Sequence, residues 1–416
     1  MLRVLANSWA LLLGVMLLML GNGIQGTLLG IRGRIEGFST TEMSYVMSAY
    51  FIGFLFGSRM TPELIRRVGH VRVFSALGSL ISAVLVLYPV APDPWAWIVL
   101  RIVIGFCFSG IYITTESWLN NTSTNETRGQ ALSLYMIVQM LGIIAAQGLL
   151  NTADPGDFTL FAIPSVLVSL AFMPILLSDA PAPAFERTER LSFAKLYRAS
   201  PLGCVGMFLL GGVFSAQFGM ASVWGSEIGL SVTRISIFVA AVYVGGLVFQ
   251  YPLGFASDRL GRRPLILVLA AVGAVVTLLP FLSWNFVLLC AVGAITGGIS
   301  NPLYSLLLAY TNDFLENREM AAASAGLIFI NGLGAIGGPI VTGWAMARVG
   351  PNGFFLVIAV LFGLLALYAA WRMTRRNVED AMVEPCSTAI LSPAASSLAV
   401  EAAMENRTHP RPAQGA

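Results

Sequence analysis

Charged residues are scarce in this chain of 416 residues, where Lys, Arg, Asp and Glu together make up 11% of the sequence. A soluble domain carries roughly a quarter charged residues, so the chain lacks the surface that keeps such a domain in solution. Histidine is scarcer still, with only His70, in an expected loop, and His409, in the tail. The net charge of +3 is small and scattered, so nucleic acid is not an expected partner.

Cysteine is also rare and shows no pairing pattern. Cys107, Cys204, Cys290 and Cys386 form no CxxC pair, and the first three lie in apolar runs. This argues against a disulfide framework and against a metal site. Phosphate-cradling loops, nucleophile elbows and an ATP-binding domain are missing as well. We therefore expect no enzyme and no cofactor, with energy from a proton gradient or from the solute's own gradient.

Long apolar runs are what the chain has instead. Hydrophobic residues make up 56% of it, in stretches of about 20 residues, the length that crosses a bilayer core of about 30 Å. Because the first run is longer than the apolar part of a signal peptide, we expect it to remain as a helix. The sequence thus predicts an all-α membrane protein. Charged and Gly/Pro-rich boundaries predict twelve spans, approximately 7–30, 42–60, 72–90, 95–118, 129–150, 158–178, 201–225, 235–254, 264–283, 286–310, 320–346 and 353–372.

Basic residues are distributed unevenly between the loops that join these spans. With both termini on the cytoplasmic side, seventeen Lys and Arg up to Arg376 fall on that side. Only Arg32, Arg34, Arg234 and Arg348 fall on the opposite side. Because cytoplasmic loops of membrane proteins are enriched in Lys and Arg, both termini are expected in the cytoplasm.

Two stretches interrupt the apolar pattern and divide the chain. The segment "SDAPAPAFERTERLSFAKLYRAS" at 178–200 is rich in Pro and Ala and then charged, and the part after Arg376 is small and polar. We expect a tail without an assigned function. The predicted units are an N-terminal six-helix bundle at 1–178, a cytoplasmic linker at 179–200, a C-terminal six-helix bundle at 201–376 and a disordered cytoplasmic tail at 377–416.

The two expected bundles resemble each other in sequence. A shift of 192 residues places several distinctive residues of the second half on matching residues of the first. Two six-helix halves in parallel repeat are typical of transporters, with the solute site near the midplane between them. The pairs are Gln25 with Gln217, Gly105 with Gly297, Tyr112 with Tyr304, Asn120 with Asn312, Gly142 with Gly334, Gln139 with Asn331 and, after one residue of slippage, Tyr50 with Tyr243 and Gly53 with Gly246.

The run "RIVIGFCFSGIYITTESWLNN" at 101–121 keeps two charges within an apolar span. Arg101, Gly105, Phe108, Tyr112 and Glu116 fall along one face of the expected helix. Arg101 and Glu116 are about 22 Å apart at a rise of 1.5 Å per residue. They cannot pair with each other, so each needs a separate partner or water.

Charges at bilayer depth are functional suspects because they are costly to bury in lipid. The positions 192 residues later hold Gly293 and Leu308, so the repeated scaffold does not require these charges. We expect Arg101 to face the central cavity, and Glu116 to bind a coupling proton or to brace an inner gate against Arg128 or the cluster from Arg66 to Arg72. The alternatives are that Arg101 snorkels to the headgroups and that Glu116 caps interfacial packing.

Uncharged polar side chains inside the spans complete the expected site. An amide in a membrane span either hydrogen-bonds a solute or joins two helices. Residues at equivalent positions of the two halves can face a common axis, which favours the repeated pairs. The expected binding residues, besides the two charges, are Asn22, Gln25, Tyr112, Gln139, Gln217, Tyr304 and Asn331.

Two motifs resemble those of the major facilitator superfamily. The loop "GFASDRLGRRP" at 254–264 is similar to the signature G-x-x-x-D-R-x-G-R-R, and "RIVIG" at 101–105 is similar to R-x-x-x-G. The loop "GSRMTPELIRRVGHVR" at 57–72 is a degenerate copy of the first motif. The resemblance covers residues 1 to about 376, and "TTESWLNNTSTNETRGQALSLYMIVQMLG" at 114–142 is similar to the YcaD-like branch of bacterial inner-membrane carriers.

The resemblance implies a cytoplasmic gate at these loops. Arg66 replaces the aspartate of the signature in the first-half copy, where Glu63 is a possible substitute. An acidic group at a helix N-terminus, paired with arginine, can hold two helices in one conformation. The alternative is a positive-inside anchor with no gating role. The expected gate residues are Gly254, Asp258, Arg259, Gly261, Arg262, Arg67 and Gly69.

These observations predict a secondary transporter, expected as a monomer in a bacterial inner membrane. The run "LYMIVQMLGIIAAQGLL" at 134–150 lacks the Gly-Pro-rich motif that drug–proton antiporters of the superfamily commonly carry, which favours uptake. Amides, tyrosines and one arginine suit a small, uncharged or weakly anionic planar molecule, such as riboflavin. The alternatives are a proton-coupled efflux carrier of drugs or metabolites and a membrane receptor or scaffold without transport.

Overall fold

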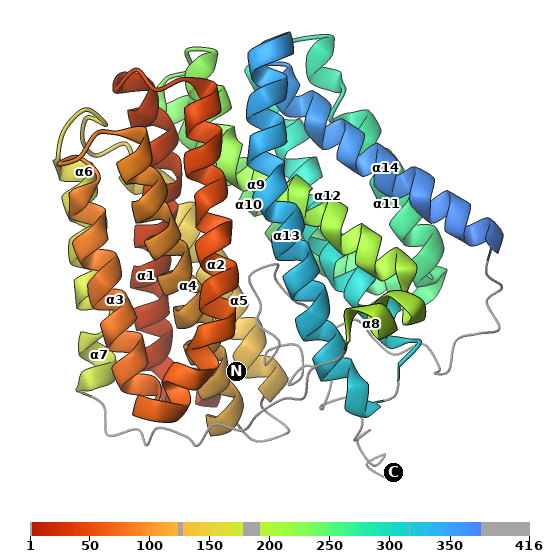
Figure 1. Cartoon of the computed structure of the whole chain (residues 1–416), viewed down its shortest axis with the longest axis horizontal. Coiled ribbons are helices and arrows are strands. Elements are labelled where there is room, and N and C mark those ends of the chain that lie inside the picture. Colours follow the sequence, from red (N-terminus) through yellow and green to blue (C-terminus); the bar gives the residue numbers. More distant parts are fainter. Residues whose placement is uncertain (1, 124–127, 178–191, 316, 376–416) are drawn as a thin grey trace.

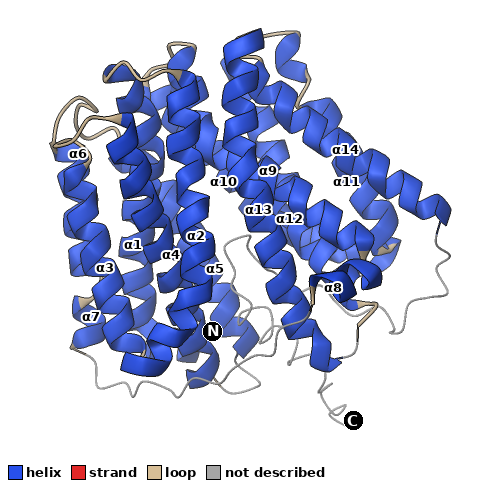
Figure 2. Ribbon diagram, in the orientation of Figure 1, coloured by secondary structure: helices blue, strands red, loops and turns tan. Residues whose placement is uncertain are grey.

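The chain folds as a bundle of long helices in a computed structural model that describes residues 2–123, 128–177, 192–315 and 317–375. Every regular element in those residues is a helix (Figure 2). The elements are α1 (Leu2–Ile35), α2 (Thr40–Val68), α3 (His70–Leu87), α4 (Pro94–Thr122), α5 (Arg128–Leu149), α6 (Thr159–Leu170), α7 (Met173–Leu176), α8 (Phe193–Ala199), α9 (Pro201–Glu227), α10 (Val232–Leu260), α11 (Arg262–Val276), η1 (Leu279–Phe281), α12 (Phe286–Asn312), α13 (Asn317–Val349) and α14 (Gly353–Arg375).

Eleven spans of the described chain are long and apolar enough to cross a membrane. The fifth of these eleven is built from α6 and α7 together, and the eighth from α11 and η1. α2 is 29 residues long but is not among the eleven, because Ser, Tyr and Glu interrupt its apolar residues. With α2, the helices match the twelve predicted spans, and the two-repeat arrangement of a transporter fold is present.

The helix boundaries repeat along the chain at the predicted spacing. Ser39 caps α2 and Ser231 caps α10, each accepting a hydrogen bond from the backbone three residues on. Asp93 and Asn285 cap α4 and α12 in the same way. Each pair of caps is 192 residues apart, and such polar caps satisfy backbone donors that a helix start leaves open. The two halves therefore begin equivalent helices at equivalent residues.

Tight crossings between helices repeat with the same spacing. A Cβ at Gly53 would collide with the carbonyl oxygen of Ile102, and a Cβ at Gly245 would collide with that of Ala294. The pairing of Gly53 with Gly246 through a slippage of one residue is therefore wrong, since the shift of 192 holds at this crossing. The crossings join α2 to α4 and α10 to α12 at a distance that only glycine allows.

The two bundles meet chiefly along three helix pairs, α1 with α9, α2 with α13, and α5 with α10, with smaller contacts of α2 with α9 and of α1 with α10. α10 is the counterpart of α2 in the second half, and α13 is the counterpart of α5. The pair of α2 with α13 is therefore equivalent to the pair of α5 with α10, as a two-fold relation between the halves requires. Figure 1 shows the bundles close together at the upper end, with the helices of the second bundle leaning away toward the lower end. The interface is thus asymmetric from end to end.

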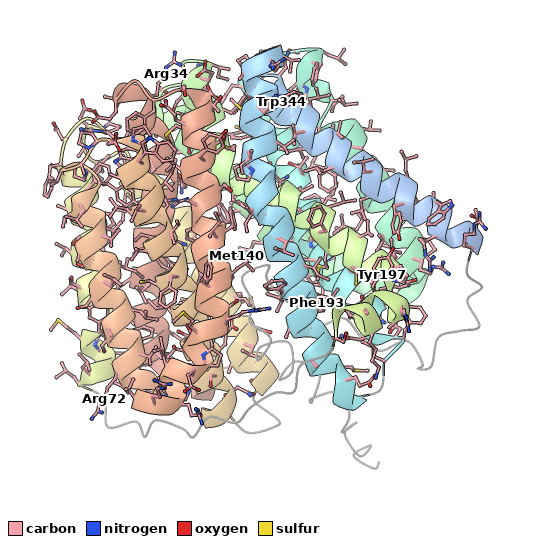
Figure 3. All side chains as sticks on the ribbon, viewed as in Figure 1. Arg34, Arg72, Met140, Phe193, Tyr197 and Trp344 are labelled. Atoms are coloured by element: carbon pink, nitrogen blue, oxygen red, sulfur yellow. The ribbon has the colours of Figure 1, made fainter. Side chains whose placement is uncertain are left out.

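Three polar contacts between the bundles lie at the upper end. The Arg34 guanidinium lies 2.7 Å from the Glu227 carboxylate, which also accepts a hydrogen bond from Thr40 at 3.3 Å. Thr233 donates to the side-chain oxygen of Asn151 at 2.7 Å. Arg34 is labelled at this end in Figure 3. We call these three contacts the seal. Farther along the interface, Ser48 of α2 donates to the backbone oxygen of Ile336 of α13 at 2.6 Å.

The described part of the predicted linker, residues 192–200, contains helix α8. Its Lys195 forms an ion pair with Glu319 of α13, and the rings of Phe193 and Phe329 lie 5.4 Å apart. α8 thereby packs on the second bundle. The predicted tail at 377–416, with Cys386, lies outside the described residues.

Candidate functional site

A cavity of about 210 Å³ lies between the two bundles. Four helices of the first half line it (α1, α2, α4 and α5), together with four of the second (α9, α10, α12 and α13). Met140, labelled between the bundles in Figure 3, is one of the lining residues. The remaining long helices α3, α6, α11 and α14 do not contribute to it. The cavity therefore occupies the axis that relates the halves.

Arg101 is the only charged side chain among the described residues that line this cavity. It is 5% exposed, so it does not snorkel toward headgroups. One terminal nitrogen donates to the Oε1 of Gln25 at 3.0 Å, and the other lies 3.5 Å from the sulfur of Met47. Its guanidinium carbon lies 4.9 Å from the centre of the Tyr50 ring. All of these partners are uncharged.

Gln25 holds Arg101 in place and does not itself line the cavity. Its Nε2 donates to the hydroxyl of Tyr88 at 3.2 Å, which leaves Oε1 to accept from Arg101. Tyr88 is fully buried and its backbone oxygen accepts from the indole of Trp97 at 3.0 Å. This chain of hydrogen bonds fixes the guanidinium from the side away from the cavity.

Three predicted amides and one predicted tyrosine also line the cavity: Asn22, Gln139, Asn331 and Tyr112. Asn22 donates to the hydroxyl of Tyr112 at 3.3 Å, and Asn331 donates to the backbone oxygen of Met207 at 2.9 Å. The Nε2 of Gln139 is buried without a hydrogen-bond partner. Five of the nine predicted binding residues, Arg101 included, thus share one cavity.

The other four predicted binding residues lie behind the cavity wall. Gln25 supports Arg101, and Gln217 accepts from Ser300 at 3.0 Å within the second bundle. Tyr304 is fully buried beside Phe214, with ring centres 6.3 Å apart. Gln25, Gln217 and Tyr304 do not line the cavity, so of these two repeated pairs only Tyr112 faces it as expected.

Glu116 is fully buried inside α4, well before the helix ends at Thr122. Its carboxyl interacts electrostatically with Tyr112, Tyr135 and Tyr304, which belong to both bundles. The predicted brace against Arg128 involves a side chain outside the described ones.

His70, which the sequence placed in a loop, is a buried residue at the start of α3. Its Nε2 lies 2.9 Å from the hydroxyl of Ser117, the residue after Glu116. The equivalent residue of the second half is Arg262, which donates to the backbone oxygen of Ala309 at 3.2 Å. Ser117 and Ala309 are also 192 residues apart. The two contacts therefore join equivalent positions of the two halves, but through different chemical groups.

The expected gate residues mark two turns of identical geometry. Gly69 has a φ of 84° between α2 and α3, and Gly261 has a φ of 79° between α10 and α11. Arg262 also forms an ion pair with Asp313, the residue that follows α12. The side chain of Asp258 is not among those described. Glycine is needed at both turns because other residues rarely adopt a positive φ.

The arginines and Glu63 at these turns contact their own helices. Glu63 binds Arg66 at 2.8 Å and Arg67 at 2.7 Å within α2, and Arg259 lies over Phe255 within α10. Glu63 thus does not stand in for the missing aspartate as a bridge between helices. Gly254 is an interior residue of α10. Arg59, earlier in the same stretch of α2, has its guanidinium carbon 4.8 Å from the centre of the Phe329 ring of α13, so this part of the first bundle does contact the second.

Aromatic residues are the part of the site that sequence reasoning missed. They form two walls, with neighbouring rings of Phe54 and Tyr112 6.1 Å apart in the first bundle, and Phe218 and Tyr243 4.6 Å apart in the second. The repeat could not have found both walls, because the backbone oxygen of Tyr50 faces Gly105 whereas that of Val242, and not of Tyr243, faces Gly297. The missed lining residues are Tyr50, Phe51, Phe54, Phe214, Phe218 and Tyr243.

Comparison with known proteins finds relatives over most of the chain. The sequence model described as Major Facilitator Superfamily matches residues 11–224 and 202–386. The chain is 26% identical over 351 residues to an uncharacterized MFS-type transporter of Enterobacter sp. (strain 638), covering 84% of this chain and 91% of that protein. It is 26% identical over 352 residues, with the same coverage, to the uncharacterized MFS-type transporter YcaD of Escherichia coli O45:K1.

Solved structures share the fold at low sequence identity. A mutant of the nucleoside transporter NupG matches with a TM-score of 0.73 and 15% identity, over 87% of this chain and 99% of that one. A bacterial homolog of the lysosomal transporter Spinster, inward-facing and occupied, matches with a TM-score of 0.71 and 15% identity, over 90% and 98%. A D-xylose–proton symporter matches with a TM-score of 0.66 and 15% identity, over 86% and 95%.

Proposed function

Because the chain belongs to the Major Facilitator Superfamily, we propose that it imports a small planar organic solute by alternating access, driven by the proton gradient. It is a multi-pass membrane protein with a transporter fold, and its relatives support secondary transport. The proposal concerns the direction of transport, the class of solute and the coupling ion. The proposed units are the bundles 1–178 and 201–376, joined by the linker 179–200 and followed by the tail 377–416.

The observation that carries the proposal is the position of the cavity. Eight helices line it, four from each half, so relative motion of the halves would expose it at one end and then the other. The seal closes the interface at the end that holds Arg34 and Glu227. A site on the axis of a repeat, with the interface between the halves closed at one end, is typical of alternating access.

The distribution of basic residues supports an inward-facing state. Seventeen Lys and Arg against four favour the end opposite the seal as the cytoplasmic one, with both termini there. The seal then lies on the outer face and the cavity would release solute to the cytoplasm. One neighbour of similar fold was solved in an inward-facing conformation, in agreement with this assignment.

Proton coupling is proposed for Glu116. It is a fully buried carboxyl among tyrosines, in the span that also carries Arg101. A carboxyl inside a membrane protein can bind and release a proton as its surroundings change between two conformations. Two neighbours of similar fold are proton symporters, one for fucose and one for D-xylose.

The solute class follows from the two aromatic walls. Rings of Tyr50 and Phe54 on one side and of Phe218 and Tyr243 on the other favour a flat molecule, since aromatic faces stack on planar rings. Drug-sized ligands occupy pockets of about 300–1,000 Å³, so a cavity of 210 Å³ favours a small solute. Riboflavin is the vitamin that tests the upper end of this size range.

The test is uptake into membrane vesicles that carry the full-length protein. A panel of labelled planar solutes, riboflavin included, is offered with and without an imposed proton gradient. Import that rises with an inward proton gradient supports the proposal. Extrusion driven by that gradient would instead indicate an efflux carrier, and no flux of any solute would favour a receptor or scaffold. Rescue of a riboflavin auxotroph at limiting vitamin tests that candidate alone.

A further inference from the structure

Within the part of the chain that the structure describes, the positive charge of Arg101 on the cavity wall has no negative counterpart. Among the described residues, no Asp or Glu lines the cavity and none forms an ion pair with Arg101. The guanidinium is held by an amide oxygen, a thioether and an aromatic face. Buried arginines in proteins are normally paired with an acid, because an unpaired buried charge is costly.

Two residues that line the cavity carry hydrogen-bond donors without a partner. The Nε of Arg101 is buried without a hydrogen-bond partner, although the side chain is 5% exposed and lines the cavity. The Nε2 of Gln139, 4% exposed, is a second buried donor without a partner on the cavity wall. Donors without acceptors and a cation without an anion are what an absent acidic ligand would satisfy.

We infer that the solute is a small aromatic monocarboxylate, an inference that rests on the proposed transport function. Its carboxylate accepts from Arg101, for which planar guanidinium geometry is well suited, and from Gln139. Its ring lies between the aromatic walls of the two bundles. Those walls are formed by Tyr50, Phe54 and Tyr112 of the first bundle and by Phe214, Phe218 and Tyr243 of the second.

A purely structural role for Arg101 is the competing explanation. In that case Arg101 clamps α4 to α1 and α2 through Gln25, Met47 and Tyr50, and its removal lowers the stability of the ligand-free protein. If the role of Arg101 is instead to bind an anionic solute, the ligand-free protein carries a buried positive charge without a negative partner. The Arg101→Leu variant should then unfold at the same or a higher temperature than the parent protein.

Matched acid and amide probes test the inference on the purified full-length protein. The pairs are benzoate with benzamide, nicotinate with nicotinamide, and indole-3-acetate with indole-3-acetamide, at neutral pH where the acids are ionised. Binding is measured by calorimetry and by the ligand-induced shift in unfolding temperature. We expect at least one acid to bind at least tenfold more tightly than its amide.

Arg101 variants then locate the preference. In Arg101→Gln the preferred acid should lose its advantage over the amide, while amide binding stays within twofold of the parent value. In Arg101→Lys part of the advantage should return. Arg234→Gln is the matched control, because Arg234 lies over the ring of Phe286, away from the cavity, and should leave the preference intact.

Three results would overturn the inference: no acid of the panel binds, the amides bind as well as the acids, or Arg101→Gln keeps the preference. A lower unfolding temperature of ligand-free Arg101→Leu would also count against it, in favour of the clamp. Gradient-driven uptake of a neutral solute such as riboflavin, with no uptake of acids, would leave the proposed function standing and remove only the anionic class. No uptake of either kind would remove both.

Discussion

Arg101 and Glu116 share one helix but meet different surroundings. Arg101 lies on the cavity wall with neutral partners, whereas Glu116 is sealed among tyrosines away from the wall. Because the two are about 22 Å apart along the helix, they act on separate partners. The same helix can therefore hold a solute at one level and a proton at another.

Substitution of Arg101 should affect transport more than folding. Arg101→Ala should lower uptake by about 30-fold or more, since truncating one partner of a buried charge pair costs about 2–5 kcal/mol. Arg101→Lys should retain an intermediate rate, because it keeps the charge but loses the planar fork that contacts Gln25. Initial uptake rates, normalised to the amount of protein in the membrane, measure the effect. Full activity of Arg101→Ala would exclude Arg101 from the site.

Substitution of Glu116 should abolish proton coupling and leave the movement of solute across the membrane intact. Glu116→Gln cannot release a proton, so uptake driven by an imposed proton gradient should disappear. Exchange of labelled for unlabelled solute without a gradient should persist. Gradient-driven uptake at the parent rate in Glu116→Gln would rule out this residue as the coupling site.

Glu63→Gln serves as the matched control at the surface. Hydrogen bonds from Arg66 and Arg67 lower the pKa of Glu63 from its ordinary value of 4.5 to about 2. Any stabilisation from this pairing is thus complete above the ordinary pKa and is lost only as the pH falls toward about 2. Glu63 stays ionised near neutral pH, so the pH profile of uptake should be the same in Glu63→Gln and in the parent protein.

At the level of helices, the repeated glycine crossings set how closely partners pack. α2 meets α4 at Gly53 and Gly105, and α10 meets α12 at Gly245 and Gly297, each without room for a Cβ beside the facing backbone. Because the obstructing atoms are backbone, a side chain there can be admitted only if a whole helix shifts. These helix pairs are therefore rigid units within each bundle.

Alanine substitutions at the crossings should destabilise both halves. Gly53→Ala and Gly245→Ala should each cost about 1–3 kcal/mol, the usual penalty for overpacking a close contact. Gly363→Ala in α14 is the control, since a Cβ there meets nothing within 4 Å. Unfolding temperatures of the purified variants measure the difference. Equal temperatures for Gly53→Ala and Gly363→Ala would show that the crossing can relax.

Most of the helices could be predicted from the sequence because lipid demands long apolar runs. α2 is instructive, since its Ser, Tyr and Glu residues keep it below the apolar threshold that the other spans meet. Its place was nevertheless predicted, although the part of the expected loop at 57–68 continues the helix and only Gly69 ends it. The buried position of His70 was missed, because a single polar residue after a glycine resembles a loop.

The site could be predicted only in part, because periodicity shows a helix face but not what that face meets. Arg101 and Asn22 were found since charges and amides are unusual in lipid spans. Phe218 was missed because a ring on the cavity wall has the same sequence pattern as a ring packed between helices. Gln217 and Tyr304 were misplaced because the repeat fixes helix position and does not require the same side-chain surroundings.

For the whole molecule, the decisive feature is the difference between its two ends. The seal joins the bundles through Arg34 with Glu227 and through Thr233 with Asn151. Every one of these groups is at a helix end or in an adjoining turn, where rearrangement leaves the bundles intact. Opening of the seal can therefore accompany a rigid movement of one bundle against the other.

Weakening the seal should shift the population of states by a small, measurable amount. Arg34 and Glu227 have side chains 55% and 33% exposed, so their pair contributes about 1 kcal/mol or less. Glu227→Gln should favour the state open at the seal by about fivefold at most. Distances between spin labels in the turns at 36–39 and 228–231 report the populations.

Glu36→Gln is the control for the seal variant, because Glu36 pairs with Arg32 of its own helix and does not cross the interface. It should leave the label distances unchanged. A shift of the same size in Glu36→Gln would attribute the effect to surface charge and not to the seal.

The glycine crossings also bear on how large a cargo this carrier tolerates. Because these helix pairs pack so closely, the walls of the cavity cannot move outward to accommodate a large solute. Discrimination by size would then be built into the framework itself. A larger cavity would require smaller residues in place of the aromatic residues that line it. Substitutions at the glycine crossings would destabilise the bundles before they widened the cavity.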